Sequence, residues 1–347
     1  MSPRGRTTFS TGLKRQEGKT KAVQLLKSWP IALLLLLIPG CTPSRSVASL
    51  SPTPPTVAQT EEKPPFTPPD AEQRMDALGR DPEPIFTHLV GFFEPIPAPG
   101  SRDWLASHEE TGQTYRQYEL SLPNRPDEVR SKIYILPLGK FEEDDPPLEQ
   151  VREYTGLFFG LPVVLLEPSS KPEVTKRTND FTQQEQWHAG ELLDLLESKL
   201  PKDAYCLLGV TMTDIYPDEE WNYVFGLASL NRRVGVYSLA RYDPEFFGDS
   251  RGENWRVDGL EKSCKVLAHE TGHMLGMAHC IFYDCLMNGS NNLGEMDRQN
   301  SFLCPICLRK LKHALGIDLH KRYQDLLQFF ERNQLEEQSE WLRKVLR

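Results

Sequence analysis

The chain has 347 residues, 39% hydrophobic and 10% aromatic, enough to bury a sizeable core as one large domain or two smaller ones. Its formal net charge is -9. Residues 1–41 carry seven basic residues and one acidic residue, which leaves 33 basic against 48 acidic residues, or -15, in the remainder. Because so acidic a body lacks the basic stripe that grips a phosphate backbone, we expect no nucleic-acid partner.

The N-terminal segment, residues 1–41, is predicted to be an export signal and is left out of the fold. Its apolar run, 31–38, is shorter than the roughly 20 residues that a membrane-spanning helix needs, but it fits the hydrophobic region of a secretory signal. The sequence IPGC at 38–41 resembles a bacterial lipoprotein box, in which the signal is cut before the cysteine and the thiol carries lipid. An ordinary signal peptide or a short anchor is the alternative. We expect an exported protein, lipid-anchored through Cys41 to a bacterial membrane on its periplasmic or cell-surface side.

Four further regions follow this signal. Residues 42–70 are rich in Pro, Ser and Thr, which predicts a semi-rigid tether between the membrane and a folded domain. Residues 71–130 are only weakly periodic and are assigned to an N-terminal extension of uncertain structure. Clear strand and helix patterns mark 131–316 as the main domain, and amphipathic helices at 317–347 are expected to pack on it.

Within the main domain, apolar runs alternate with amphipathic segments. The strands predicted from the apolar runs cover 132–138, 161–168, 204–214, 221–230 and 233–242. The helices predicted from amphipathic spacing cover 148–160, 188–200 and about 259–277, with more helices to the C-terminus. This alternation predicts an α/β (α+β) fold, in which a mixed sheet carries a packed helix.

The sequence HETGHMLGMAH, which begins at His269, has the spacing of a zinc site. His269 and His273 are four residues apart, so a helix places both imidazoles on one face, where they can meet a single zinc. Glu270 is not spaced as a third ligand, but it can reach a water bound to the metal and take its proton. Gly276 can adopt a positive φ and end the helix, so that the chain turns back and delivers His279 as the third ligand.

Three histidines leave the fourth position of the metal open for water, which is typical of a catalytic zinc site. HExxH alone also occurs by chance on solvated helix faces, whereas HExxHxxGxxH followed by a Met-turn is the metzincin signature. Met287, eight residues after His279, is the candidate for the Met-turn, whose methionine forms an apolar floor under the imidazoles. Ordinary core packing of Met287 is compatible with that role.

Four of the seven cysteines form two close pairs after the third histidine: Cys280, Cys285, Cys304 and Cys307. The second pair is a CxxC knuckle, and a knuckle with another close pair is the pattern of a closed tetrahedral zinc site. Two disulfide bridges are the alternative, because an exported protein meets oxidising conditions. A zinc here would hold the chain after the third histidine from outside the catalytic site. The remaining Cys206 and Cys264 are predicted to be small buried hydrophobes.

These motifs together resemble the archaemetzincins, a metzincin family with a second zinc site. The likeness rests on HExxHxxGxxHC (269–280), Cys285, Met287, GSN (289–291), Glu295, Asp297-Arg298, LCPICLRKL (303–311) and the upstream segments VTMTDIY (210–216), NYVFGLAS (222–229) and VYSLARY (236–242). It covers about 130–316. It implies a metzincin-like zincin fold with a twisted mixed sheet, an active-site helix and a C-terminal helical part.

The resemblance also implies roles for individual residues. It implies that His269, His273 and His279 hold a catalytic zinc with Glu270 as general base. The residues that it implies for a structural zinc are Cys280, Cys285, Cys304 and Cys307. We therefore expect a zinc metallopeptidase with two Zn²⁺ per chain, monomeric, acting on a peptide or protein substrate.

The substrate cleft is expected along an edge strand at 222–229, which can pair with an extended peptide. Tyr223 and Phe225 are candidates for its walls, although such side chains are more often part of the core. Two other functions remain open at this point. One is a zinc-stabilised, surface-tethered binding lipoprotein with little or no turnover, and the other is a zinc hydrolase that acts on peptidoglycan peptides.

Overall fold

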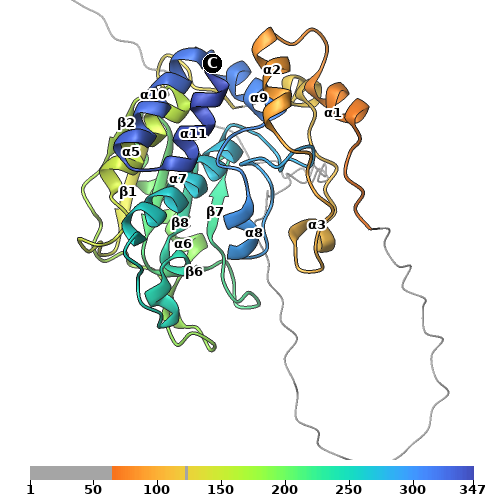
Figure 1. Ribbon diagram of the computed structural model, residues 1–347. Helices are drawn as coiled ribbons and strands as arrows, with labels where there is room; N and C mark the ends of the chain where they lie inside the picture. The colour runs from red at the N-terminus through yellow and green to blue at the C-terminus, as the bar shows by residue number, and fades with distance from the viewer. Residues whose placement is uncertain (1–64, 122–123) are drawn as a thin grey trace, which may run out of the picture. The chain divides into compact units, whose positions relative to one another are not determined.

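The computed structural model describes residues 65–121 and 124–347 (Figure 1). The predicted signal segment with Cys41, and the predicted tether up to residue 64, lie outside the described residues. Within the described part, no helix has both the length and the apolar character needed to cross a membrane.

A five-stranded mixed sheet lies at the centre of the fold, in the order β2-β1-β5-β8-β7. Its strands are β1 (Lys132–Leu138), β2 (Val163–Leu165), β5 (Ala204–Thr211), β7 (Gly226–Ser229) and β8 (Val234–Ser238). The first four strands of that order run parallel, whereas β7 pairs antiparallel with β8 and occupies an edge. The predicted α/β class with a mixed sheet is therefore confirmed, and β1 has the predicted bounds.

Helices cover both faces of this sheet, as the alternation of side chains along β1 shows. Ile133 and Ile135 belong to the hydrophobic cluster that includes residues of α5 (Leu148–Phe159) and α7 (Trp255–Met274). Tyr134 and Leu136 point to the opposite cluster, which includes the buried leucines of α6 (Ala189–Ser198). Burial on both faces explains why the parallel strands read as unbroken apolar runs rather than as alternating ones.

The helices of the C-terminal part are α8 (Leu293–Arg298), α9 (Pro305–Leu315), α10 (Leu319–Arg332) and α11 (Glu336–Val345). Helix α10 runs beside α5, where Phe329 packs on Tyr154 with ring centroids 5.7 Å apart and Arg322 Nε donates to the Phe158 carbonyl at 2.7 Å (Figure 1). The segment 317–347, which holds α10 and α11, was predicted to pack on the main domain, and these contacts of α10 agree with that prediction.

The weakly periodic N-terminal extension is helical and packs on the same body. Its helices are α1 (Ala71–Leu78), α2 (Pro84–Leu89), η1 (Val90–Phe92), α3 (Trp104–Ser107) and α4 (Tyr115–Leu120). Capping boxes begin α1 at Asp70 and α4 at Thr114, and Arg309 Nη1 of α9 donates to the Leu78 carbonyl at 2.7 Å. Helices this short contain too few turns for a recognisable apolar period, which is why the sequence left the region unassigned.

A small second sheet, in the order β3-β4-β6, flanks the first, and two further 3₁₀ turns follow β8. These elements are β3 (Lys176–Thr178), β4 (Glu185–His188), β6 (Asp214–Tyr216), η2 (Ala240–Tyr242) and η3 (Pro244–Phe247). The strands predicted at 221–230 and 233–242 are thus shorter than expected at both outer ends.

Candidate active site and metal centres

The last turns of α7 and the chain that follows it bring three imidazoles together. The ligand-type nitrogens of His269, His273 and His279 all lie within 4.8 Å of one another. The Nε2 atoms of His269 and His273 are 3.0 Å apart, and a tetrahedral zinc with bonds of 2.0–2.1 Å separates two ligand nitrogens by about 3.3 Å. The three predicted ligands therefore meet at a point that fits one zinc ion.

The turn after α7 is what brings the third imidazole back. The helix ends at Met274, and Gly276 has a φ of 81°, a left-handed conformation that a glycine adopts without steric strain. The Met277 amide then bonds back to the Gly272 carbonyl at 3.2 Å, which reverses the chain toward His279. The predicted use of Gly276 to end the helix is confirmed.

Backbone carbonyls orient the first two imidazoles. His269 Nδ1 donates to the Leu286 carbonyl and His273 Nδ1 donates to the Met277 carbonyl, each at 2.7 Å. Because a carbonyl oxygen only accepts, Nδ1 carries the proton in both rings and Nε2 is left as the metal ligand. Burial lowers the pKa of His269 to about 3 and that of His273 well below its usual value, so both rings are neutral, the form that binds metal.

The third imidazole is oriented by a carboxylate that the sequence did not reveal. His279 Nδ1 donates to Glu110 Oε1 at 2.8 Å, across 169 residues of sequence. Burial opposes ionisation of Glu110, but the hydrogen bonds from His279 and Trp104 hold the pKa of its carboxyl below the usual value. Glu110 lies in the weakly periodic extension, where one acidic residue among several carries no signal of its position in space.

Glu270 is buried beside the three imidazoles and lines the cavity next to them. Its Oε2 has no hydrogen-bond partner among the described residues, and burial raises the pKa of its carboxyl to about 8. An unpaired buried carboxylate oxygen is costly unless something neutralises it. A cation held by the imidazoles would offset that cost, so the acid and the histidines fit a metal site together.

Met287 lies against α7, where a Met-turn is expected. It is fully buried, and a Cβ placed on Gly272, between the two helical histidines, would lie 2.6 Å from its Sδ. Only a glycine allows the thioether to approach the helix this closely. The Met287 carbonyl also accepts a hydrogen bond from the Cys280 amide at 2.7 Å, which ties the turn to the start of the cysteine cluster.

The four clustered cysteines converge in a second, fully enclosed group. Their sulfurs lie within 4.8 Å of one another, with Cys280 Sγ and Cys304 Sγ 3.7 Å apart. Tetrahedral zinc with Zn–S bonds of 2.3 Å separates sulfurs by about 3.8 Å, whereas a disulfide needs about 2.05 Å. No disulfide forms among the six described cysteines, and Cys206 and Cys264 are buried as predicted. The spacing of the cluster therefore fits a metal rather than the two bridges.

Charge around this cluster also suits a cation. Burial opposes ionisation of the thiols, yet hydrogen bonds from the other three lower the pKa of Cys280 well below its usual value. The amides of Met287 and Cys304 donate to Cys285 Sγ at 3.5 and 3.2 Å. A sulfur that accepts backbone N–H groups is prepared to carry the negative charge that a metal would neutralise.

The cavity beside the imidazoles, about 60 Å³, reaches the edge of the main sheet. Phe225 and Gly226 line it from the start of β7, and Phe225 stacks on Tyr242 with ring centroids 5.1 Å apart. Phe225 is therefore placed where a substrate wall was predicted. Tyr223 is not among the residues that line this cavity, and its ring packs against the Arg241 guanidinium, 3.4 Å from the ring centroid.

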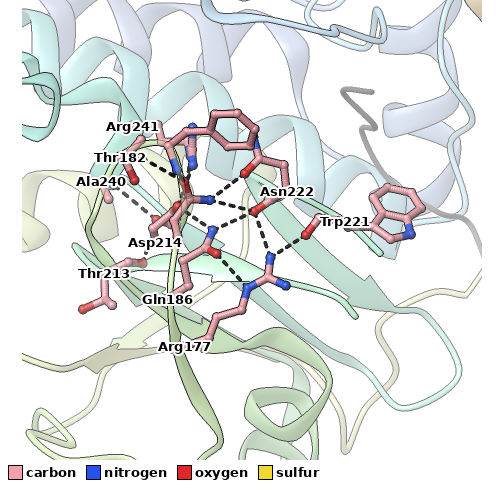
Figure 2. A network of polar contacts seen from close by, with 12 residues as sticks. Arg177, Thr182, Gln186, Thr213, Asp214, Trp221, Asn222, Ala240 and Arg241 are labelled. Carbon is pink, nitrogen blue, oxygen red and sulfur yellow. Dashed lines mark hydrogen bonds and ion pairs between the residues drawn. The ribbon is translucent and has the colours of Figure 1, made fainter. Parts of the chain in front are cut away.

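A buried polar network, drawn in Figure 2, holds the segment before β7. Arg241 donates twice to Asp214, at 2.9 and 2.7 Å, and Gln186 Nε2 donates both to Asp214 at 2.7 Å and to the Asn222 carbonyl at 2.8 Å. Arg177 donates to the carbonyls of Trp221 and Asn222. These bonds occupy the carbonyls of Trp221 and Asn222. The strand predicted at 221–230 begins only at Gly226, after an isolated antiparallel bridge between Val224 and Ile215.

Comparisons with known proteins point to the same family as the motifs of the sequence. The sequence profile of Peptidase family M54 matches residues 192–313. Archaemetzincin-2 from Mus musculus is 36% identical over 276 residues, 71% of this chain and 77% of its own. Archaemetzincin-2 from Homo sapiens is 38% identical over 279 residues, with the same shares covered.

Among solved structures, archaemetzincin (AmzA) from Archaeoglobus fulgidus, complexed with malonate, is 29% identical with a TM-score of 0.39. The alignment covers 52% of this chain and 99% of that one.

Proposed function

The chain belongs to the archaemetzincin family of zinc metallopeptidases, and from this premise we propose that it hydrolyses peptide bonds with Glu270 as general base. The observation that carries the proposal is the environment of Glu270. Its carboxylate is buried beside three converging imidazoles at the wall of a cavity, and its Oε2 has no hydrogen-bond partner among the described residues. An acid in such surroundings is suited to accept a proton and return it.

The residues around the cavity have different roles in the proposed hydrolysis. The imidazoles of His269, His273 and His279 would hold the zinc, which would supply polarisation of the scissile carbonyl and a lowered pKa of the bound water. Glu270 takes the proton of the attacking water at Oε2 and passes it to the leaving amine. Strand β7 lies at the sheet edge, where an extended peptide can pair with its backbone, and Phe225 walls the adjoining cavity.

We propose a second, structural zinc on Cys280, Cys285, Cys304 and Cys307. The sulfur separation of 3.7 Å, the complete burial of the group and the backbone donors to Cys285 Sγ support it. Four protein ligands leave no position open for water, which is typical of a structural zinc. Two zinc ions per chain are thus expected in metal analysis.

The test of the proposed base is Glu270→Gln. We expect turnover to fall by about 10²–10⁴-fold, the usual contribution of a general base, while both zinc ions remain bound. Cleavage is followed on a peptide library by mass spectrometry, with zinc counted in the same samples and chelator-treated protein as the blank. Isolated peptidoglycan is assayed beside the library to identify the substrate class.

The matched control is Glu261→Gln, the same substitution on the same helix, at a carboxylate that hydrogen-bonds to Ser301 and Gln338 away from the cavity. It should leave turnover unchanged. Full cleavage by the zinc-loaded Glu270→Gln protein would remove Glu270 from the mechanism. Absence of turnover of either substrate by the zinc-loaded natural chain would favour a binding protein instead.

We also propose that the protein is exported and lipid-anchored through Cys41. The support is the sequence, with a basic N-terminus, the apolar run at 31–38, the IPGC box and the Pro-rich residues behind it. In a bacterial host, Cys41→Ser should move the protein out of the membrane fraction and abolish labelling by radioactive palmitate. A labelled, membrane-bound Cys41→Ser protein would contradict the anchor.

A further inference from the structure

The three imidazoles of the catalytic centre differ in what holds them. His269 and His273 donate to carbonyls of the same C-terminal half of the chain, at Leu286 and Met277. His279 donates instead to a carboxylate of the N-terminal extension, Glu110. The side chains of this pair are 13% and 21% exposed, so the contact is largely shielded from water.

We propose that the N-terminal extension completes the catalytic metal site, with Glu110 as a positioning residue for the third ligand. By accepting a hydrogen bond from Nδ1–H, Glu110 fixes the tautomer and the ring plane of His279 so that Nε2 faces the other two imidazoles. A carboxylate in this place also makes the imidazole a stronger ligand than a carbonyl partner does. The inference rests on the proposed function, since it concerns the same metal site.

Glu110 is itself fixed by a buried tryptophan. Trp104 Nε1 donates to Glu110 Oε1 at 2.9 Å, so two donors converge on one carboxylate oxygen. The indole is 4% exposed, and its edge meets the His279 ring at a centroid distance of 5.3 Å. A Cβ on Gly289 would come within 2.5 Å of the indole, so Trp104 packs closely against the segment after Met287. The carboxylate is thus preorganised rather than mobile.

The same extension also holds the turn that delivers His279. Gln113 Nε2 donates to the Gly276 carbonyl and Gln113 Oε1 accepts from the Ala278 amide, both at 3.2 Å. Tyr118, fully buried, donates to the Leu275 carbonyl at 2.8 Å. The extension therefore satisfies three backbone groups of the turn and orients the ring at its end. Ordinary packing of a surface extension would not require this match of donors and acceptors.

The decisive experiment measures zinc affinity at the histidine site by competition with a chromogenic chelator, in the full chain. Glu110→Gln keeps the size of the side chain and an oxygen acceptor but removes the charge. We expect it to weaken zinc binding at the histidine site about 10–100-fold, the usual effect of losing a carboxylate behind a metal-bound histidine, while the cysteine-site zinc stays bound. Gln113→Ala should weaken the same site to a smaller extent.

The matched control is Glu119→Gln, a half-buried carboxylate of the same extension that pairs with Arg116 and makes no contact with His279. It should leave zinc affinity at both sites unchanged. The unfolding midpoint of the metal-free chain is measured in parallel, because a purely structural role would lower that midpoint whereas a positioning role would leave it in place.

Two outcomes overturn the proposal. One is a Glu110→Gln protein that binds its histidine-site zinc as tightly as the natural chain. The other is a loss of zinc at both sites together with a lowered midpoint of the metal-free chain, which marks a packing residue. Because the readout is binding and not turnover, a chain that binds zinc as expected but cleaves nothing would contradict only the proposed function.

Discussion

The two candidate metal centres are neighbours in sequence but are built in different ways. The cysteine group comes entirely from the segment 280–307, and every one of its side chains is at most 2% exposed. The histidine group draws on α7, on the turn after it and, through Glu110, on the distant N-terminal extension. It also opens onto a cavity and contains a buried acid with an unpaired oxygen.

The first group has the features of a structural metal site, and the second has those of an open site that water can reach. A closed set of four sulfurs has no position left for chemistry, and its proposed role is to hold the chain between Cys280 and α9 in place. The histidine group is open to the cavity, so that water can reach it. Its geometry therefore depends on the residues that surround and orient the three imidazoles. His279 and Cys280 are adjacent, so a metal bound by the cysteines would also fix the position of His279.

The largest effect is expected from breaking the closed centre with Cys304→Ser. Zinc binding to structural sites is worth about 10–16 kcal/mol in small zinc-binding peptides, so even partial loss should lower the free energy of unfolding by several kcal/mol. We expect zinc to fall from two ions to at most one per chain and turnover to fall with it, because Cys280 no longer fixes His279. Metal analysis and denaturant unfolding measure both changes.

The control for this experiment is Cys206→Ser, which changes an equally buried cysteine of β5 that lies outside the cluster. It should cost about 1–3 kcal/mol, the price of a buried hydroxyl without a partner, with both zinc ions retained. A Cys304→Ser protein that keeps two zinc ions and its stability would show that the cluster is not a metal site, and the contrast between the two centres would disappear.

The same contrast explains what the sequence could predict. Motifs whose residues meet within one helix and its following turn, such as His269, His273 and His279, depend on local geometry that spacing reveals. Strand β1 was predicted with its observed bounds because burial on both faces leaves an unbroken apolar run. The cysteine group was predictable for the same reason, since its members are close in the chain.

What the sequence did not reveal depends on contacts between distant segments. Glu110 contacts His279 only after the N-terminal extension has folded. The helices of the extension are too short for a pattern of apolar residues that would predict this contact. The strand before the turn at 230–233 was predicted to start too early, because Arg177 and Gln186 bind the carbonyls at its expected start. Before Gly226, Val224 makes only an isolated antiparallel bridge to Ile215. Hydrogen bonds from side chains to the backbone compete with the hydrogen bonds between strands, and the spacing of apolar residues in the sequence does not predict them.

A smaller effect, on the order of 3–5 kcal/mol, is expected from the buried acid of the open centre once its zinc is removed. Burial raises the pKa of Glu270 to about 8, so the folded metal-free chain keeps a proton that the unfolded chain releases above about pH 4.5. The folded state then binds more protons, and its stability is complete at low pH and declines as the pH rises from about 4.5 to 8. Denaturant unfolding at a series of pH values, on protein stripped of the histidine-site zinc, measures this decline against Glu270→Gln.

The Glu270→Gln chain lacks this proton but keeps the neutral imidazoles of His269 and His273, so their contribution cancels when the two proteins are compared. The difference in stability between them should grow across that pH range and shrink again when zinc is restored, because the cation neutralises the carboxylate. Curves that run parallel in the metal-free proteins would mean that Glu270 is already ionised without zinc. Its Oε2 would then belong to a hydrated carboxylate, and burial would place no cost on that charge for the metal to relieve.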